Sequence, residues 1–198
     1  MLRLRLLLIP LLIVLAAPAA ALGRENPADE LLHIPIEAST YDPATHCSAK
    51  SRPGVVKMTQ WLEENSRGVF WGSYRCEMWG KKEASLHAEN RAIDWHLDRD
   101  VRADRRAARK LIELLLATDA AGNAQALARR MGVEELIWDC GYWAAGMTEF
   151  IPYRVCFNKR GKEIKGVNKT VAHRDHVHIG MTKAGAAAKT SFWRRHTG

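Results

Sequence analysis

One polar segment constrains this chain more than any other. The segment from Ser85 to Asp94 reads Ser-Leu-His-Ala-Glu-Asn-Arg-Ala-Ile-Asp and places the imidazole of His87 seven positions before the carboxylate of Asp94. Residues 91 to 96 alternate in character, so a strand there would put Asp94 and His96 on one face. We expect His87 in the loop that leads into this strand. The fold must therefore bring a polar strand face next to a polar loop.

A second polar cluster, His-Arg-Asp-His-Val-His from His173 to His178, lies far downstream. His176 and His178 are two positions apart and would share one strand face. Imidazole nitrogens and carboxylate oxygens are ordinary zinc ligands, and a catalytic zinc site takes three protein ligands and leaves the fourth position to water. His87, Asp94 and His178 would form such a set. Either cluster alone favours an ordinary polar surface instead, but the two together favour a metal site.

The two clusters also carry a resemblance. Ser-x-His-x6-Asp from Ser85 to Asp94, followed by Asp-His-x-His from Asp175 to His178, resembles the zinc D-alanyl-D-alanine peptidase superfamily, which includes hedgehog-like folds. More closely, the chain resembles secreted bacterial domains related to those peptidases and to extensin-like carboxy-terminal domains. The likeness runs from about residue 41 to 193, and Asn90 stands where the family pattern has glycine. Asn tolerates a left-handed backbone best among non-glycine residues, so the turn can survive. Further matching positions are Arg91-Ala92, Ile137-Trp138 and Thr190-Ser-Phe-Trp193.

The resemblance implies a fold, a reaction and roles for several residues. The fold would be α+β, a small, mostly antiparallel sheet with helices packed on it. The reaction would be metal-assisted hydrolysis of amide bonds in peptidoglycan peptides, with one Zn²⁺ held by the three residues named above. Asp175, three positions before the last ligand, is implied as the general base, and this role requires a turn or bulge before His176. Arg75, twelve positions before the first ligand, is implied as the cation that stabilises the tetrahedral intermediate.

Each of these roles has an alternative. Asp175 can instead hold a ligand imidazole in its tautomer, and Arg75 can simply pair with Glu77. His176 would either orient the ligand that shares its strand face or stabilise the oxyanion. The whole domain can also be a cell-wall binding module that keeps the fold without turnover.

The amino terminus predicts export. A short basic start is followed by an apolar run from Leu6 to Ala17 and by the small-residue site Ala19-Ala20-Ala21, so residues 1–21 read as a signal peptide. The alternative, a membrane anchor, is disfavoured because the run is short and contains Pro10. We expect residues 22–40 to be a flexible lead-in and residues 41–198 to form a single domain. The mature protein would be secreted or periplasmic, without a stable membrane span.

Cysteine usage agrees with export. The chain has four cysteines, an even number, which indicates two disulfides with three possible connectivities. We prefer Cys47 with Cys76, which would tie the amino-terminal segment to a strand, and Cys140 with Cys156, which would close a hairpin-like excursion. A zinc site built from these cysteines is the alternative, but C-x2-C spacing is missing.

Net charge bears on partners. The formal charge of +8 falls to about +6 once Arg3 and Arg5 leave with the signal, and excess positive charge attracts polyanions. We expect peptidoglycan or another cell-wall polymer as the partner, not nucleic acid, and a monomer. Plain solubility is the alternative explanation of the charge.

Periodicity and capping residues predict the remaining elements. The predicted helices run from a Ser51 cap to Asn65, from a cap at Asp98 or Asp100 to Thr118, from an Asn123 cap to Met131 with Gly132 ending it, and briefly around Phe192 and Trp193. The predicted strands are a buried one over Val69–Trp71 that continues through Ser73–Cys76, a central one over Val133–Trp138, and others over Tyr153–Phe157 and Val177–Gly180. A polar, Lys-rich loop over Asn158–Lys169 would lie at the rim of a cleft.

Overall fold

The computed structural model describes residues 26–195, and the predicted signal peptide lies outside this range. Within it, the chain forms an α+β fold around a six-stranded sheet whose neighbouring strands are all antiparallel, in the order β1-β4-β8-β5-β6-β7. This confirms the expected fold class. The strands of the large sheet are β1 (Val69–Gly72), β4 (Ala92–His96), β5 (Val133–Trp138), β6 (Gly141–Ala144), β7 (Ile151–Pro152) and β8 (His176–Met181), and β2 (Met78–Gly80) pairs with β3 (Glu83–Ala84) in a separate hairpin.

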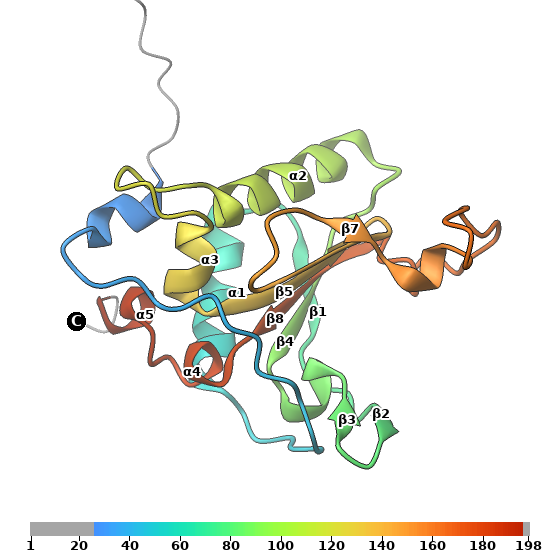
Figure 1. Ribbon diagram of the computed structural model, residues 1–198, viewed down its shortest axis with the longest axis horizontal. Helices are drawn as coiled ribbons and strands as arrows, with labels where there is room; N and C mark the ends of the chain where they lie inside the picture. The colour runs from blue at the N-terminus through green and yellow to red at the C-terminus, as the bar shows by residue number, and fades with distance from the viewer. Residues whose placement is uncertain (1–25, 196–198) are drawn as a thin grey trace, which may run out of the picture.

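Helices cover one face of the large sheet. In Figure 1 the three longest helices gather on one side, and the β2–β3 hairpin and the loop after β7 extend away from it. The α-helices are α1 (Pro53–Asn65), α2 (Arg102–Leu116), α3 (Ala126–Met131), α4 (Lys183–Ala186) and α5 (Ser191–Arg195), and short 3₁₀ turns are η1 (Pro27–Leu31), η2 (Leu86–Glu89) and η3 (Arg154–Cys156).

The core lies between the sheet and these helices. Successive strand residues point to opposite faces, and the helix-covered face carries the fully buried side chains of Trp95 on β4, Val177 on β8 and Leu136 on β5. The terminal helix adds Phe192 and Trp193, both buried as expected. Burial of these large apolar groups is the main stabilisation of the domain.

The opposite face carries the polar residues of the two sequence clusters. The pairing of β4 with β8 sets Asp94 directly opposite His178 and His96 opposite His176. On the other side of β8, the backbone of Ile137 on β5 is opposite His178. The two predicted clusters therefore meet at the centre of the sheet, where neighbouring strands on both sides fix their positions.

Several other predictions are confirmed. Asn90 adopts the left-handed conformation, with φ 54° and ψ 44°, at the end of η2. Gly132 ends α3 with φ 74°, and β5 lies in the interior of the sheet. Both preferred disulfides form, with Cα separations of 5.3 Å for Cys47–Cys76 and 5.7 Å for Cys140–Cys156.

The predicted strand around Val69 is wrong in burial and in length. β1 ends at Gly72, and its Val69 and Trp71 side chains are 55% and 50% exposed. β1 is an edge strand with β4 as its one neighbour, so apolar composition alone did not predict its exposure. The strand predicted over Tyr153–Phe157 is also wrong, because residues 154–156 form the turn η3.

The predicted helix caps are wrong as well. α1 begins after Arg52 rather than after Ser51, α2 after Val101, and α3 after Gln125. The carboxylate of Asp98 accepts a hydrogen bond from the Asp100 amide instead of capping α2. Turn hydrogen bonds of this kind compete with capping for the same side chains.

Residues 26–40 do not behave as the predicted flexible lead-in. Ala28 and Leu31 of η1 are fully buried in the main core. Asn26 caps η1 by accepting a hydrogen bond from the Ala28 amide. The segment then runs as an extended strap past α5 and α4 (Figure 1), so the sparse apolar residues of this stretch anchor it to the domain.

Candidate metal centre

Three side chains from separate elements converge on one point. His87 Nε2 lies 3.0 Å from Asp94 Oδ1 and 3.1 Å from His178 Nδ1, and the last two atoms are 3.4 Å apart. Two ligand atoms that each lie about 2.05 Å from zinc at a tetrahedral angle are about 3.3 Å apart. All three residues are buried. The triangle of donor atoms therefore has the size of one face of a tetrahedral site, and this group can hold a metal ion.

Local sequence explains how His87 reaches this point. Ser85 caps η2 by accepting a hydrogen bond from the His87 amide at 3.3 Å. The Asn90 amide donates to the His87 carbonyl at 3.0 Å, and the left-handed Asn90 turns the chain directly into β4. The short turn η2 thus connects His87 directly to β4, the strand that carries Asp94.

The second ring nitrogen of each histidine has an acceptor beside it. His87 Nδ1 lies 2.9 Å from the Ser73 carbonyl, so with a metal bound Nδ1 would donate to this carbonyl and Nε2 would face the ion. His178 Nε2 lies 3.1 Å from Glu135 Oε1, so with a metal bound Nδ1 would face the ion. Histidines that bind metals usually donate their other N–H to a carboxylate or a carbonyl. The donor set therefore fits a divalent ion in its chemistry as well as in its spacing.

Burial and hydrogen bonding shift the protonation of this group. Burial dominates at His87 and lowers its pKa. Burial opposes charge on His178, but the nearby carboxylates of Asp94 and Glu135 outweigh it and raise the pKa of His178 to about 9. Burial also opposes charge on Asp94, yet hydrogen bonds from both histidines hold its pKa well below the usual range. Asp94 is thus an anion that compensates positive charge at the centre.

The predicted catalytic residue His176 lies beside the three donor atoms. Its Nε2 is 3.4 Å from Asp94 Oδ1, and its Nδ1 is 2.8 Å from Asp175 Oδ1. The other oxygen of Asp175 accepts a hydrogen bond from the Thr170 hydroxyl at 2.6 Å. Within residues 26–195, the lining of the cavity at the centre includes His176 and Thr170 but not Asp175. Asp175 therefore reaches the centre through His176.

Arg75 contacts Glu77, the partner considered for it, and also Asp94 at the centre. Its Nη1 lies 3.3 Å from Asp94 Oδ2, and its Nε lies 3.3 Å from Glu77 Oε2. Its side chain is 56% exposed, so the guanidinium stands at the mouth of the cavity, where it can meet a bound ligand.

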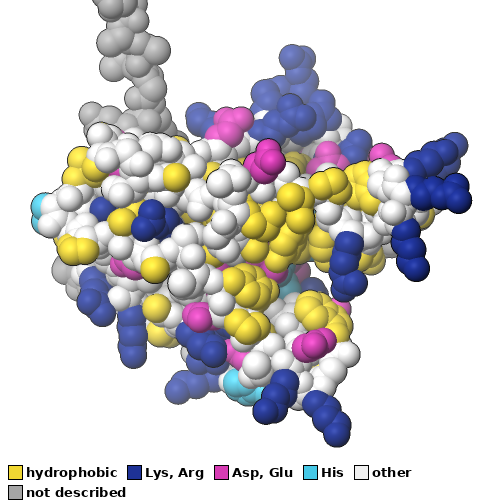
Figure 2. Space-filling view, in the orientation of Figure 1, with side chains coloured by type: hydrophobic (Ala, Val, Ile, Leu, Met, Phe, Trp, Pro, Cys, Tyr) yellow, Lys and Arg dark blue, Asp and Glu magenta, His cyan; other side chains and the backbone are white. Residues whose placement is uncertain are grey.

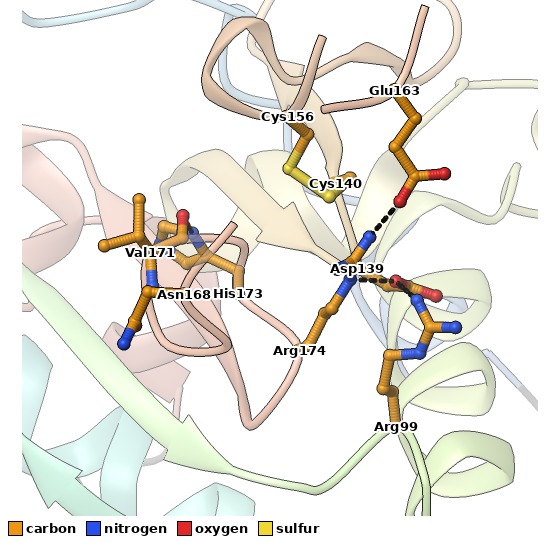
Figure 3. The surroundings of a disulfide bond; sticks show 9 residues. All are labelled: Arg99, Asp139, Cys140, Cys156, Glu163, Asn168, Val171, His173 and Arg174. Carbon is orange, nitrogen blue, oxygen red and sulfur yellow. Dashed lines mark hydrogen bonds and ion pairs between the residues drawn. A yellow bond between two sulfur atoms is a disulfide. The ribbon is translucent and has the colours of Figure 1, made fainter. Parts of the chain in front are cut away.

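The segment before β8 is held against the end of β5. The Asp139 amide donates to the His173 carbonyl at 2.7 Å, and His173 has a left-handed backbone with φ 50°. Figure 3 shows Arg174 reaching Asp139 and Glu163 beside the Cys140–Cys156 disulfide, with Arg99 also paired to Asp139. Burial lowers the pKa of the His173 imidazole to about 2, so this ring is neutral where it lines the cavity. The ion pairs and the disulfide thus fix the loop that carries His173 and Asp175.

Two adjoining hollows surround the centre. The cavity over the donor atoms has a volume of about 400 Å³. A neighbouring groove of about 320 Å³ is lined mainly by aromatic and aliphatic side chains and shares Trp79, Glu135, Ile137 and Tyr153 with it. Figure 2 shows hydrophobic side chains gathered over the region between β7 and the β2–β3 hairpin. The centre therefore lies next to a surface lined by aromatic and aliphatic side chains.

The sequence interpretation missed Glu135 and its partners. Glu135 Oε2 lies 3.1 Å from the Tyr41 hydroxyl and 3.2 Å from the Tyr142 hydroxyl, and both hydroxyls donate to it. The available signal was the pair Glu134-Glu135 within an otherwise apolar run from Val133 to Trp138. Two acids in a buried central strand need partners, but the sequence alone does not say which.

Comparisons with protein-family models, curated proteins and solved structures found no match. Among residues 26–195, none of the helices is long and apolar enough to cross a bilayer. The geometry of the centre is therefore the main basis for a functional assignment.

Proposed function

We propose that this protein is an exported, zinc-dependent peptidase that hydrolyses amide bonds in peptidoglycan peptides. The observation that carries the proposal is the triangle of donor atoms from His87, Asp94 and His178, with edges of 3.0, 3.1 and 3.4 Å. The resemblance of the two sequence motifs to zinc D-alanyl-D-alanine peptidases supports the reaction class. The two disulfides support export to an oxidising compartment.

The residues around the centre have complementary roles in this proposal. A zinc ion held there would supply an activated water and polarise the substrate carbonyl. His176 Nε2 faces the centre and accepts the proton of the attacking water, while Asp175 holds the opposite nitrogen and stabilises the charged ring. Arg75 stands at the mouth and stabilises the negative charge that develops on the carbonyl oxygen.

The surroundings suit a cell-wall peptide. The cavity holds the scissile amide, and the adjoining aromatic groove, with Trp79 and Tyr153 shared between the two hollows, holds the rest of the chain. The Lys-rich loop after η3 projects beyond the sheet, and its cationic side chains gather at one end of the molecule (Figure 2). Exposed cations of this loop favour an anionic polymer; they are Lys159, Arg160, Lys162 and Lys165.

A second candidate is a cell-wall binding module on the same fold. The observation in its favour is the position of Asp175, whose carboxylate is engaged by His176 and Thr170 rather than lining the cavity. If His176 does not take the proton, the centre binds a metal and a peptide without turnover.

The test is a digest of purified peptidoglycan followed by mass spectrometry. The chain is incubated with added zinc, with a chelator, and as the Asp175→Ala and His176→Ala variants. Peptidase activity predicts new fragments whose masses identify the bond, lost with chelator and in both variants. An unchanged fragment pattern with the folded, zinc-loaded chain would sink the proposal. Retention of the chain on the insoluble wall in that case would favour the binding module.

A further inference from the structure

Glu135 is a buried acid beside the candidate centre. It lies on the central strand β5, is 9% exposed, and points to the same side of the sheet as His178 on the neighbouring strand. An isolated carboxylate at such a site would be strongly disfavoured. We therefore expect the buried carboxylate to be paired with a cationic group or to accept hydrogen bonds.

The two oxygens of Glu135 divide their contacts. Oε1 lies 3.1 Å from His178 Nε2, and Oε2 accepts hydrogen bonds from the hydroxyls of Tyr41 and Tyr142. Tyr41 comes from the amino-terminal strap and Tyr142 from β6, so groups far apart in the sequence clamp the carboxylate from two sides. The carboxylate thus has a fixed position relative to the imidazole.

The His178 ring depends on this carboxylate. Its Nε2 is buried and, among the described residues, has no partner that meets strict hydrogen-bond geometry. Glu135 Oε1 lies 3.1 Å from it, within ion-pair distance, and is the acceptor beside this nitrogen. When a metal displaces the proton of Nδ1 and the remaining proton stays on Nε2, Nδ1 would face the ion between Asp94 and His87. The neighbouring Glu134 cannot replace Glu135, because it pairs with Arg91 at 2.7 Å.

We propose that Glu135, held by Tyr41 and Tyr142, is the positioning residue that orients His178 for metal binding. It fixes the tautomer and the direction of the ring and compensates part of the charge of a divalent ion. This inference rests on the metal site of the proposed function but not on hydrolysis. Loss of an outer partner of a metal-bound histidine typically weakens metal affinity about 10- to 100-fold.

The experiment measures the metal affinity of the purified, disulfide-bonded chain with Zn²⁺ and a competing chromophoric chelator. We expect Glu135→Gln and Glu135→Ala to weaken zinc binding about 10- to 100-fold, with alanine the weaker binder. Tyr142→Phe and Tyr41→Phe should each weaken it less, because one hydroxyl remains on Oε2. Glu113→Gln, which makes the same charge change at an exposed position of α2, is the matched control and should bind as the parent chain does.

A second readout separates positioning from a merely structural role. The visible spectrum of the Co²⁺-loaded chain reports the geometry of the ligands, and we expect it to change in Glu135→Gln while the metal-free variant stays folded. If Glu135→Ala prevents folding, Glu135→Gln, Tyr142→Phe and Tyr41→Phe still test whether Glu135 affects metal binding. Parental affinity and spectrum in Glu135→Gln, or a parent chain that binds neither ion, would overturn the proposal. Tight zinc binding without amide cleavage would defeat only the proposed function.

Discussion

The two faces of the central sheet are built from the same strands, but one face forms the apolar core and the other carries the candidate metal centre. On β4, Trp95 points into the apolar core and the preceding Asp94 points to the candidate centre. On β8, Val177 and His178 divide in the same way. One face is stabilised by apolar burial under helices, and the other holds buried polar groups through hydrogen bonds and ion pairs.

This difference shows how a small domain can keep buried charges in place. Side chains that alternate along a strand share one backbone, so packing on the covered face fixes the positions of polar groups on the other. The site residues then need only local partners, such as Ser73 for His87 and Glu135 for His178. Substitutions on the two faces should therefore separate stability from metal binding.

The largest effect is expected on the covered face. Trp95 is fully buried, and its indole Nε1 donates to the Arg67 carbonyl at 2.9 Å. Trp95→Ala should lower the free energy of unfolding by about 3–5 kcal/mol, because it leaves a large cavity and an unpaired carbonyl. Denaturant titration of the metal-free chain measures this. A loss below about 1 kcal/mol would contradict the assignment of this face as the core.

The next effect concerns Glu134, the neighbour of Glu135 on β5. Burial raises the pKa of Glu134 to about 7, although the Asp42 amide and Arg91 oppose the shift. The folded state therefore holds its proton to a higher pH than the unfolded chain does. This contribution to stability is fully present below about pH 4.5 and is lost as the pH rises through about 7, a change of about 3 kcal/mol.

Urea titrations of the parent chain and of Glu134→Gln across this pH range test the linkage. The difference in stability between the two chains should change between pH 4.5 and 7, with the parent losing stability relative to the variant as the pH rises. A constant difference would show that Glu134 is ionised throughout, as its contact with Arg91 alone would favour.

Asp94→Asn should affect metal binding more than stability, whereas Trp95→Ala mainly lowers stability. The amide keeps the shape of the side chain but removes the anionic ligand, so zinc affinity should fall by at least about 100-fold, or about 2.7 kcal/mol. The stability of the metal-free chain should fall less than in Trp95→Ala, although the protonated His178 loses an anionic partner. Chelator competition measures the affinity, and unaltered zinc binding would exclude Asp94 from the metal site.

The smallest effect is expected at the rim of the polar face. Trp71 on the edge strand stacks on His96 with ring centroids 4.2 Å apart, yet it is half exposed. Trp71→Ala should cost about 0.5–1.5 kcal/mol of stability, more than the same change at Val69, which is the exposed control on that strand. Equal effects of the two substitutions would show that the stacking contributes nothing.

Much of the frame could be predicted from the sequence. Period-two alternation predicted the strands that carry Asp94 and His178. The even cysteine count predicted two disulfides, and the preferred pairs are the ones that form. Strand alternation is visible within a few neighbouring residues, and each cysteine can form a disulfide with only one other cysteine. The structure brings His87, Asp94 and His178 together as the motif spacing predicted, while their function stays a proposal.

Other features depended on partners distant in the sequence. The exposure of Val69 follows from the place of β1 at the sheet edge, and the packing of Leu31 follows from contacts of the strap with the helices. Neither the exposure of Val69 nor the packing of Leu31 can be predicted from the residues next to it in the sequence. The helix caps failed for a related reason, since the carboxylate of Asp98 found a turn amide instead of a helix amide.

By itself, the sequence determined the alternation of the strands, the number of disulfides and the side chains with metal-binding chemistry. Tertiary structure alone decided that the donor atoms lie 3.0 to 3.4 Å apart and that Glu135 meets His178. It also decided that Asp175 faces His176 rather than the cavity. The physical reason is that distances and directions between side chains depend on strand order, register and loop packing, which arise from contacts across the whole chain.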